Sequence, residues 1–238
     1  MKPLKRRPKK VLAAEIDGLW WRIESQTDYA KALLLMRGSI DFYKDGLLHR
    51  EDGPAVIEAD GNKFWFLNGK RHRADGPAII WTDGSKFWYL NGKRHREAGA
   101  AAIWADGTEE WYQNGLLHRA DGPAVIWVDG SKFWHLNGKL HRVDGPAAIE
   151  TDGTEKWYLN DKLHRADGPA VMYKDGNKEW HLNGKLHRVD GPTVIEVDGH
   201  EEWYLDGLLH REDGPAVMYK DGNKEWHLNG KFVKHETP

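Results

Sequence analysis

Residues 134–156 read W-H-L-N-G-K-L-H-R-V-D-G-P-A-A-I-E-T-D-G-T-E-K, and the chain repeats this stretch with a period of 23 residues. An aromatic residue, Phe42 in the first repeat and Trp in the others, precedes each His-Arg pair by seven positions. Eight full repeats therefore occupy residues 42–225, and a partial repeat occupies residues 226–238. A constant period of this size indicates an array in which each repeat packs on its neighbours. The histidines that mark the period are His49, His72, His95, His118, His141, His164, His187 and His210.

Each repeat predicts a β-hairpin with a long inner loop. Alternation in Lys-Phe-Trp-Tyr-Leu and in Ala-Val-Ile-Trp is typical of strands, whereas the Asn-Gly and Asp-Gly pairs favour the positive φ angles of turns. No helical period appears between residues 42 and 225. From strand alternation we expect the Trp, the Leu, and the Ala and Ile of the second strand to form the core face. The sequence therefore predicts an all-β fold, an elongated, twisted single-sheet β-hairpin repeat solenoid.

The first 41 residues lie outside the repeats. Residues 1–10, MKPLKRRPKK, hold six basic side chains and no acidic one, which predicts a basic flexible arm. Residues 11–41 are predicted to form a small α/β N-terminal cap, with a strand over Leu19 to Ile23 and one short helix that ends at Gly38. A cap of this kind would cover the first edge of the sheet.

Composition excludes several classes of protein. With 39% hydrophobic residues and 13 Trp, the chain is unlike a disordered one. The absence of Cys excludes disulfides, thiolate metal sites and thiol nucleophiles. No apolar run approaches the roughly 18 residues of a membrane span, so we predict no integral membrane association. Val11 to Ala14 is too short for the apolar region of a signal peptide, which predicts a cytoplasmic location.

The repeated His, Arg and Asp side chains are candidates for chemistry. Equivalent atoms in neighbouring hairpins lie roughly 9 to 10 Å apart, two strand spacings, which is too far to share one zinc ion. We expect the imidazole and the guanidinium instead to bind backbone carbonyls and the Asp carboxylate of the His-Arg-x-Asp-Gly-Pro loop. The sequence also has no phosphate-binding loop, Gly-x-Ser-x-Gly or His-Glu-x-x-His motif. It therefore predicts no enzyme activity, no catalytic residue, no metal and no cofactor.

Aromatic residues gather on the face opposite the expected core, in the first half of the array. This aromatic stripe consists of Phe64, Trp81, Phe87, Trp104, Trp127 and Phe133, beside Phe66, Tyr89 and Tyr112, with Arg71 and Arg94 nearby. An exposed patch rich in Trp and Tyr marks a partner-binding site. If the inner loops cover the stripe, the same residues form a second core, and the sequence leaves both interpretations open. Glu97-Ala98-Gly99-Ala100 breaks the loop motif in the same region, either as part of a binding site or through drift.

The repeat resembles a known family. The period, the aromatic start, the Lys-x-His after the Gly and the Asp-Gly turn resemble MORN-type repeats and their bacterial variant over residues 42–238. The form His-Arg-x-Asp-Gly-Pro-Ala is similar to repeats of phage and large-virus proteins. The resemblance implies β-hairpins that act as a scaffold for protein partners, with a disputed role for lipid. The four-residue spacing from Trp to Gly and the Arg after the histidine depart from the family pattern.

A second resemblance is to the Trp-Tyr-x-Leu-Asn hairpins of choline- or glucan-binding repeats. It implies a secreted cell-wall protein. The shorter period of those repeats and the expected absence of an export signal argue against it.

We therefore expect a non-enzymatic scaffold that binds a protein partner through the aromatic stripe. The phage-like repeat form implies a phage-encoded inhibitor of a host factor. The alternative is a nucleic-acid-associated protein anchored by its basic arm, although 29 basic and 37 acidic side chains outside the arm oppose a nucleic acid wrapped along the repeats. The oligomeric state stays open, because an exposed sheet edge can pair with a second copy. The arm residues expected to contact phosphate or an acidic partner are Lys2, Lys5, Arg6, Arg7, Lys9 and Lys10.

Overall fold

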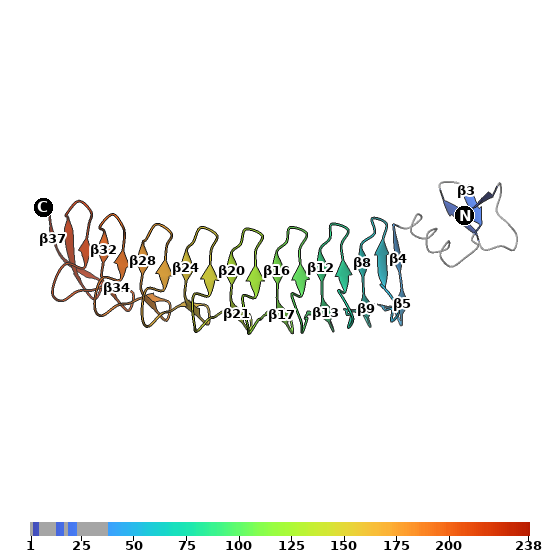
Figure 1. Ribbon diagram of the computed structural model, residues 1–238, viewed down its shortest axis with the longest axis horizontal. Coiled ribbons are helices and arrows are strands. Elements are labelled where there is room, and N and C mark those ends of the chain that lie inside the picture. The colour runs from blue at the N-terminus through green and yellow to red at the C-terminus, as the bar shows by residue number, and fades with distance from the viewer. Residues whose placement is uncertain (1, 5–12, 17–18, 23–37) are drawn as a thin grey trace. The chain divides into compact units, whose positions relative to one another are not determined.

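The computed structural model describes residues 2–4, 13–16, 19–22 and 38–238, and none of these residues is helical. Within this part of the chain, accordingly, no helix has the length and apolarity needed to cross a membrane. The prediction of an all-β fold built from repeated hairpins is confirmed (Figure 1). The chain divides into two compact units: Met1–Gly107 with Trp111–Gly115, and Thr108–Glu110 with Leu116–Pro238.

The N-terminal residues that the structure describes form a three-stranded antiparallel sheet. Its strands are β1 (Lys2–Leu4), β2 (Ala13–Ile16) and β3 (Leu19–Arg22), in the order β1-β3-β2. β3 coincides with the strand predicted over Leu19 to Ile23. Lys2 to Leu4 were expected in a flexible arm, but they pair with β3, and an edge position tolerates the missing N–H of Pro3. The predicted cap helix and residues 5–10 lie outside the described residues.

Every repeat adds two short antiparallel strands to a main sheet. Ile79 pairs with Phe64 of the preceding strand and with Phe87 of the following one, so backbone hydrogen bonds join successive repeats. In the first unit the main-sheet strands are β4 (Ser39–Asp41), β7 (Val56–Glu58), β8 (Lys63–Phe64), β11 (Ile79–Ile80), β12 (Lys86–Phe87) and β15 (Ala102–Ile103). In the second unit they are β16 (Glu109–Glu110), β19 (Val125–Ile126), β20 (Lys132–Phe133), β23 (Ala148–Ile149), β24 (Glu155–Lys156), β27 (Val171–Met172), β28 (Lys178–Glu179), β31 (Val194–Ile195), β32 (Glu201–Glu202), β35 (Val217–Met218), β36 (Lys224–Leu228) and β37 (Lys231–Glu236).

A second, smaller hairpin stands where the sequence predicted a long inner loop. Phe66 pairs with Arg71 across an Asn-Gly turn, in which Asn68 has a φ angle of 49°. Trp65 lies between the main-sheet hairpin of the preceding repeat and the small hairpin of its own, and it belongs to neither. In the first unit these short strands are β5 (Tyr43–Lys44), β6 (Leu47–Leu48), β9 (Phe66–Leu67), β10 (Lys70–Arg71), β13 (Tyr89–Leu90), β14 (Lys93–Arg94) and β17 (Tyr112–Gln113). In the second unit they are β18 (Leu116–Leu117), β21 (His135–Leu136), β22 (Lys139–Leu140), β25 (Tyr158–Leu159), β26 (Lys162–Leu163), β29 (His181–Leu182), β30 (Lys185–Leu186), β33 (Tyr204–Leu205) and β34 (Leu208–Leu209).

The Asp-Gly turn closes each main-sheet hairpin and also links it to the next repeat. The Trp81 N–H donates to the Ser85 carbonyl at 3.0 Å, and the Ser85 N–H donates to the Asp83 carboxylate at 2.8 Å. Gly84 has a φ angle of 100°, which glycine adopts without steric cost. The Ser85 hydroxyl accepts the N–H of Ala105, one repeat further on, at 3.0 Å. The turn residues therefore determine both local shape and stacking.

The core of the first unit lies between the main sheet and the small hairpins. Its buried centre consists of main-sheet residues Phe64, Ile79, Phe87 and Ala102. The small-hairpin residues that pack against this centre are Phe66, Tyr89 and Tyr112. The expectation for the second strand is right for Ala78 and wrong for its Ile, because Ile79 is buried and Ile80 is half-buried. Ala78 lies just before the strand and not within it, so alternation counted from Ala78 assigns the wrong face to Ile80.

Candidate partner-binding surface

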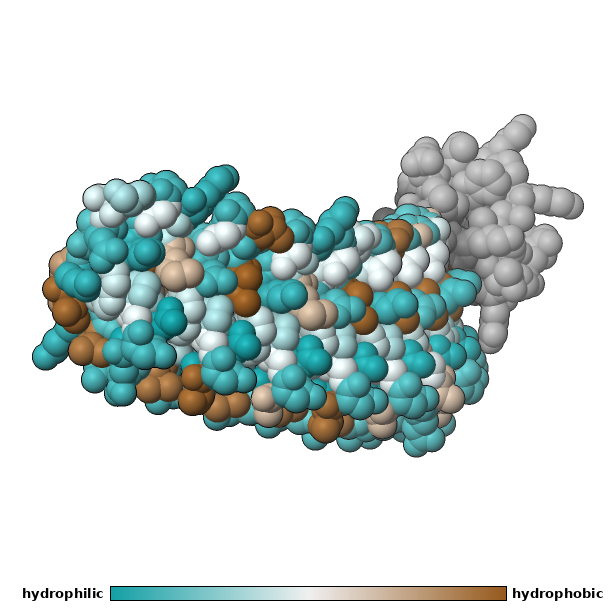
Figure 2. All heavy atoms as spheres, turned by 60° about the vertical axis from the view of Figure 1, so that its left-hand side comes forward, coloured by the Kyte–Doolittle hydropathy of each residue, from teal (hydrophilic) through white to brown (hydrophobic). Residues whose placement is uncertain are grey.

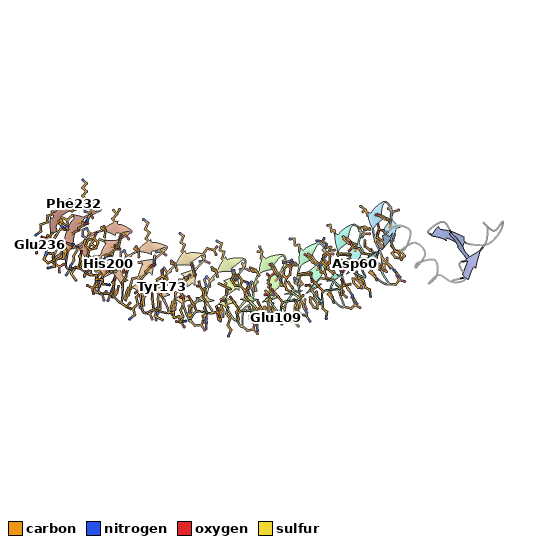
Figure 3. The ribbon with its side chains drawn as sticks, turned by 90° about the horizontal axis from the view of Figure 1, so that it is seen from above. Asp60, Glu109, Tyr173, His200, Phe232 and Glu236 are labelled. Atoms are coloured by element: carbon orange, nitrogen blue, oxygen red, sulfur yellow. The ribbon has the colours of Figure 1, made fainter. Side chains whose placement is uncertain are left out.

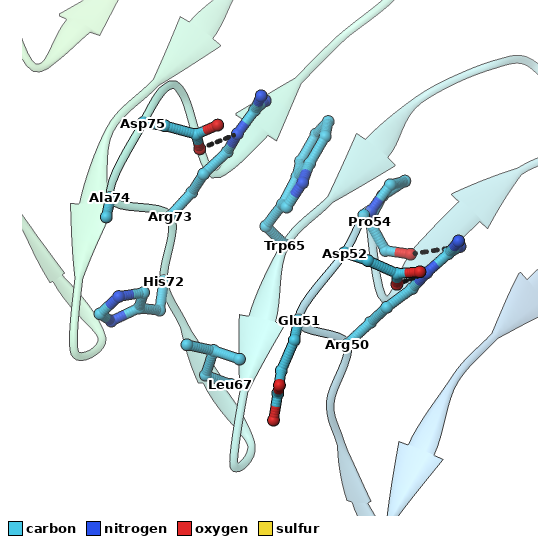
Figure 4. A pocket seen from close by; sticks show the side chains of 11 residues that line it. Arg50, Glu51, Asp52, Pro54, Trp65, Leu67, His72, Arg73, Ala74 and Asp75 are labelled. Atoms are coloured by element: carbon cyan, nitrogen blue, oxygen red, sulfur yellow. Dashed lines mark hydrogen bonds and ion pairs between the residues drawn. The ribbon is translucent and has the colours of Figure 1, made fainter.

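The His-Arg-x-Asp-Gly-Pro loop forms a stack that recurs in the repeats (Figure 4). Arg73 Nε donates to the Asp75 carboxylate at 2.9 Å, and its Cζ atom lies 4.2 Å from the centroid of the Trp65 ring. Arg73 Nη1 donates to the Pro77 carbonyl at 3.3 Å. Gly76 packs so closely on the guanidinium that an added Cβ would lie 2.9 Å from Cζ. The predicted guanidinium contacts to a carboxylate and a backbone carbonyl are confirmed.

Grooves lie between successive loops, and their charged side chains are already paired. The groove between the loops of Arg50 and Arg73 has a volume of about 500 Å³. The hydrogen bond and charge of Arg73 lower the pKa of Asp75, and Arg50 does the same for Asp52. Each carboxylate therefore stays ionised beside its own guanidinium. This pairing is what stacking of the loops requires.

The repeated histidine joins neighbouring small hairpins. His72 Nδ1 accepts the backbone N–H of Asn91, in the next repeat, at 3.2 Å, and His49 accepts that of Asn68 at 3.1 Å. The Oδ1 atom of Asn91 lies 3.0 Å from the same Nδ1, so the tautomer of the ring decides whether Nδ1 accepts the backbone N–H or donates to Oδ1. The expectation that the imidazole binds backbone carbonyls is wrong, because the histidine contacts the backbone N–H and the side chain of the Asn in the next small hairpin. Among the described residues, no three His, Asp or Glu side chains are arranged to hold a metal ion.

Part of the predicted stripe surrounds a pocket in the first unit, called here the aromatic pocket. It has a volume of about 450 Å³. The structure brings five of the predicted partner-binding residues together around it, from strands and turns of two successive repeats. The sequence did not single out its turn residues, although the Asp-Gly pair marks where they lie. The lining residues are Arg71, Ile79, Trp81, Asp83, Ser85, Phe87, Tyr89, Arg94 and Trp104.

The stripe divides into buried phenylalanines and exposed tryptophans. Phe64 and Phe87 are 8% and 4% exposed and belong to the core, whereas Trp81 and Trp104 are each 37% exposed. Trp81 meets Phe64 edge to face, with ring centroids 5.3 Å apart and planes at 89°. Trp104 meets Phe87 in the same way at 4.8 Å and 78°. Each tryptophan is therefore anchored on the core by one part of its ring and presents the rest to solvent.

The two arginines of the pocket differ in their surroundings. Arg94 is half-buried and donates to the hydroxyls of Tyr89 and Tyr112 at 3.2 and 3.3 Å. Its Cζ atom lies 5.1 Å from the Phe87 ring centroid, within cation–π range. Arg71 is exposed, and its Cζ atom lies 5.6 Å from the Tyr89 ring centroid. Arg94 is thus held in a fixed position, while Arg71 stands at the solvent-facing rim.

The remaining predicted stripe residues belong to the second unit. Trp127 is 48% exposed, and its ring lies 4.7 Å from that of half-buried Phe133. Further along, the position of Trp127 carries polar side chains, such as Tyr173 (Figure 3) and Glu196. Hydrophobic and hydrophilic residues both reach the surface, as the face in Figure 2 shows.

A Glu-His-Tyr network replaces the phenylalanine in the second unit. Glu179, at the position of Phe87, accepts hydrogen bonds from Tyr173 Oη at 2.9 Å and His181 Nε2 at 2.8 Å. The bond from His181, supported by Tyr173, lowers the pKa of Glu179 against the effect of burial. Burial and the neighbouring Glu179 raise the pKa of Tyr173 to about 12. This position of the face is therefore apolar at Phe87 in the first unit and acidic at Glu179 in the second.

The network makes the free energy of unfolding depend on pH in the acidic range. Because the folded pKa of Glu179 lies below its ordinary value of 4.5, its contribution is complete above pH 4.5 and is lost as the pH falls below that value. We expect the difference in free energy of unfolding between the native protein and Glu179→Gln to shrink from about pH 6 to about pH 3, measured by urea unfolding. A difference that is constant over this range would contradict the prediction.

Other predicted residues lie away from the pocket. Lys2 is in β1, and the other five basic residues of the arm lie outside the described residues. Among Glu97 to Ala100, none lines the aromatic pocket. This loop still stacks Arg96 at 4.0 Å over Trp88, and Arg96 Nη1 still donates to the Ala100 carbonyl. Ala98 lacks the carboxylate that the other loops offer to the arginine.

Comparison with known proteins does not assign the chain to a family. The hairpin repeat is established by the structure, and the resemblance to MORN-type repeats stays a prediction. The chain matches no protein-family model, and no curated protein matches its sequence.

Proposed function

We propose that this protein is a non-enzymatic repeat scaffold that binds a protein partner through the aromatic pocket. The observation that carries the proposal is the pair of tryptophans, Trp81 and Trp104, each anchored edge to face on a buried phenylalanine and each 37% exposed beside the same pocket. Trp and Arg are the residues that most often dominate the energy of protein interfaces. Anchored rings lose little conformational freedom on binding, which favours affinity.

The identity of the protein partner is a separate, more specific proposal. Inhibition of a host factor is a proposal that comes from the phage-like form of the repeat. Identification of a bound protein would test it directly.

Single alanine variants test the proposed surface. We expect Trp81→Ala and Trp104→Ala each to weaken partner binding by about tenfold, because each removes a central aromatic contact. The partner is first captured from a lysate by the tagged protein, with and without nuclease, and its affinity for each variant is then measured by titration. Val189→Ala is the control, because Val189 is 84% exposed on a loop of the second unit.

The outcomes separate the possible functions. Circular dichroism and urea unfolding of each variant establish that the fold is retained. Equal binding by the Trp variants and the control would contradict the proposed surface. Capture that disappears with nuclease would instead favour the nucleic-acid alternative.

A further inference from the structure

Two arginines distinguish the aromatic pocket from the equivalent face of the other repeats. Arg71 and Arg94 occupy the position just before the repeated histidine. The other six full repeats carry leucine there: Leu48, Leu117, Leu140, Leu163, Leu186 and Leu209. The two repeats that carry an arginine at this position are therefore the repeats that contain Trp81 and Trp104. In the six other repeats, leucine at this position is sufficient for stacking. The two cations are not needed for stacking.

The pocket holds these cations among mainly neutral side chains. Arg94 donates to the phenol groups of Tyr89 and Tyr112, which bear no charge. In the part of the chain that the structure describes, no carboxylate lies within ion-pair distance of Arg71. Of the pocket-lining residues only Asp83 is acidic, and its carboxylate accepts the N–H of Ser85. Arg71 therefore presents a positive charge at the exposed rim of the pocket.

We infer that the aromatic pocket receives an acidic segment of the protein partner, in which a Glu or Asp carboxylate pairs with Arg71 and an adjacent apolar side chain packs on Trp81 and Trp104. This inference rests on the proposed function, because it specifies the chemistry of the partner at the same surface. Charge complementarity carries it: a cation at the rim attracts a carboxylate, and the exposed rings beside it bury the apolar neighbour.

A nucleic acid fits the pocket less well than an acidic peptide does. Tight binding to a phosphate backbone needs several cationic contacts along its length, and this pocket offers two. The pocket lining also includes Asp83, which is exposed. Its carboxylate repels a continuous polyanion more strongly than a single partner carboxylate held by Arg71.

A peptide selection on the full chain tests the inference. A random-peptide display library is selected on the native protein, and the affinities of the enriched peptides are then measured by fluorescence polarisation. We expect enriched peptides to place Glu or Asp beside Phe, Trp or Leu. Changing the acidic residue of a selected peptide to its amide should weaken binding by about five- to tenfold.

Matched variants identify the contribution of the arginine. Arg71→Leu introduces the residue that six other repeats accept at this position, so the fold is expected to persist. It should weaken the acidic peptide by about five- to tenfold and leave the amide peptide almost unchanged. Arg71→Lys, which keeps the charge, should recover part of the loss. Lys70→Gln removes a neighbouring exposed charge and should have less than about a twofold effect.

The results distinguish a wrong inference from a wrong function. Selected peptides without an acidic preference, failure to enrich any peptide, or equal binding of acidic and amide peptides would overturn the inference. Binding of a mixed-sequence single-stranded DNA with the same dependence on Arg71 would also overturn it. Acidic peptides that need Arg71 but are insensitive to Trp81→Ala and Trp104→Ala would show that the proposed surface is wrong.

Discussion

Phe87→Ala is expected to lower the free energy of unfolding by about 3 to 5 kcal/mol, the largest stability loss that we predict for a single substitution in this protein. Phe87 is 4% exposed and packs with Phe64, Ile79 and Ala102 in the core of the first unit. Trp104 also rests on its ring at a centroid distance of 4.8 Å. Removal of the ring leaves a cavity that two-residue strands fixed by sheet pairing on both sides have little freedom to close.

Phe133→Ala provides the matched control for this prediction. Phe133 occupies the same position in a repeat of the second unit but is half-buried. Because less apolar area is buried there, we expect a loss of about 1 to 2 kcal/mol. Urea unfolding followed by tryptophan fluorescence measures both variants. Equal losses, or a larger loss at Phe133, would contradict the assignment of the core.

Gly191→Ala is expected to cost about 2 kcal/mol, although it adds a single methyl group. A Cβ at this position would lie 2.8 Å from Arg188 Cζ. The guanidinium would have to leave the Trp180 ring, whose centroid lies 4.2 Å away, and its bonds to Asp190 and Pro192, both 3.0 Å long. Hydrogen bonds from a charged group and a cation–π contact together account for the expected loss.

The Arg188→Ala background separates this mechanism from a backbone effect. Gly191 has no positive φ angle, so alanine fits its backbone. With the guanidinium removed, we expect Gly191→Ala to be neutral or to stabilise the protein by a few tenths of a kcal/mol, because alanine restricts the unfolded chain. A double-mutant cycle with urea unfolding measures the coupling. The same loss in both backgrounds would contradict the close approach of Gly191 to Arg188.

The sequence grouped residues that the structure brings together, and their role in binding stays a prediction. Trp81, Phe87, Trp104, Arg71 and Arg94 line one pocket. The pattern did not show which of these rings are exposed. Exposure depends on whether a side chain lies on a strand or on a turn, and the main-sheet strands from β4 to β35 are only two or three residues long.

The regular period and the turn residues by themselves determined that this protein is a repeated β-hairpin array. The Asn-Gly pairs and the Asp-Gly pairs of the main-sheet turns adopt positive φ angles at Gly, a local property of the backbone, whereas the glycines of the Asp-Gly-Pro loops do not. Only the tertiary structure decided that each repeat holds two hairpins, and that Phe87 is buried while Trp104 remains at the surface. These features depend on which side chains the neighbouring repeats bring into contact. Strands of two residues are too short for their alternation to specify a buried face.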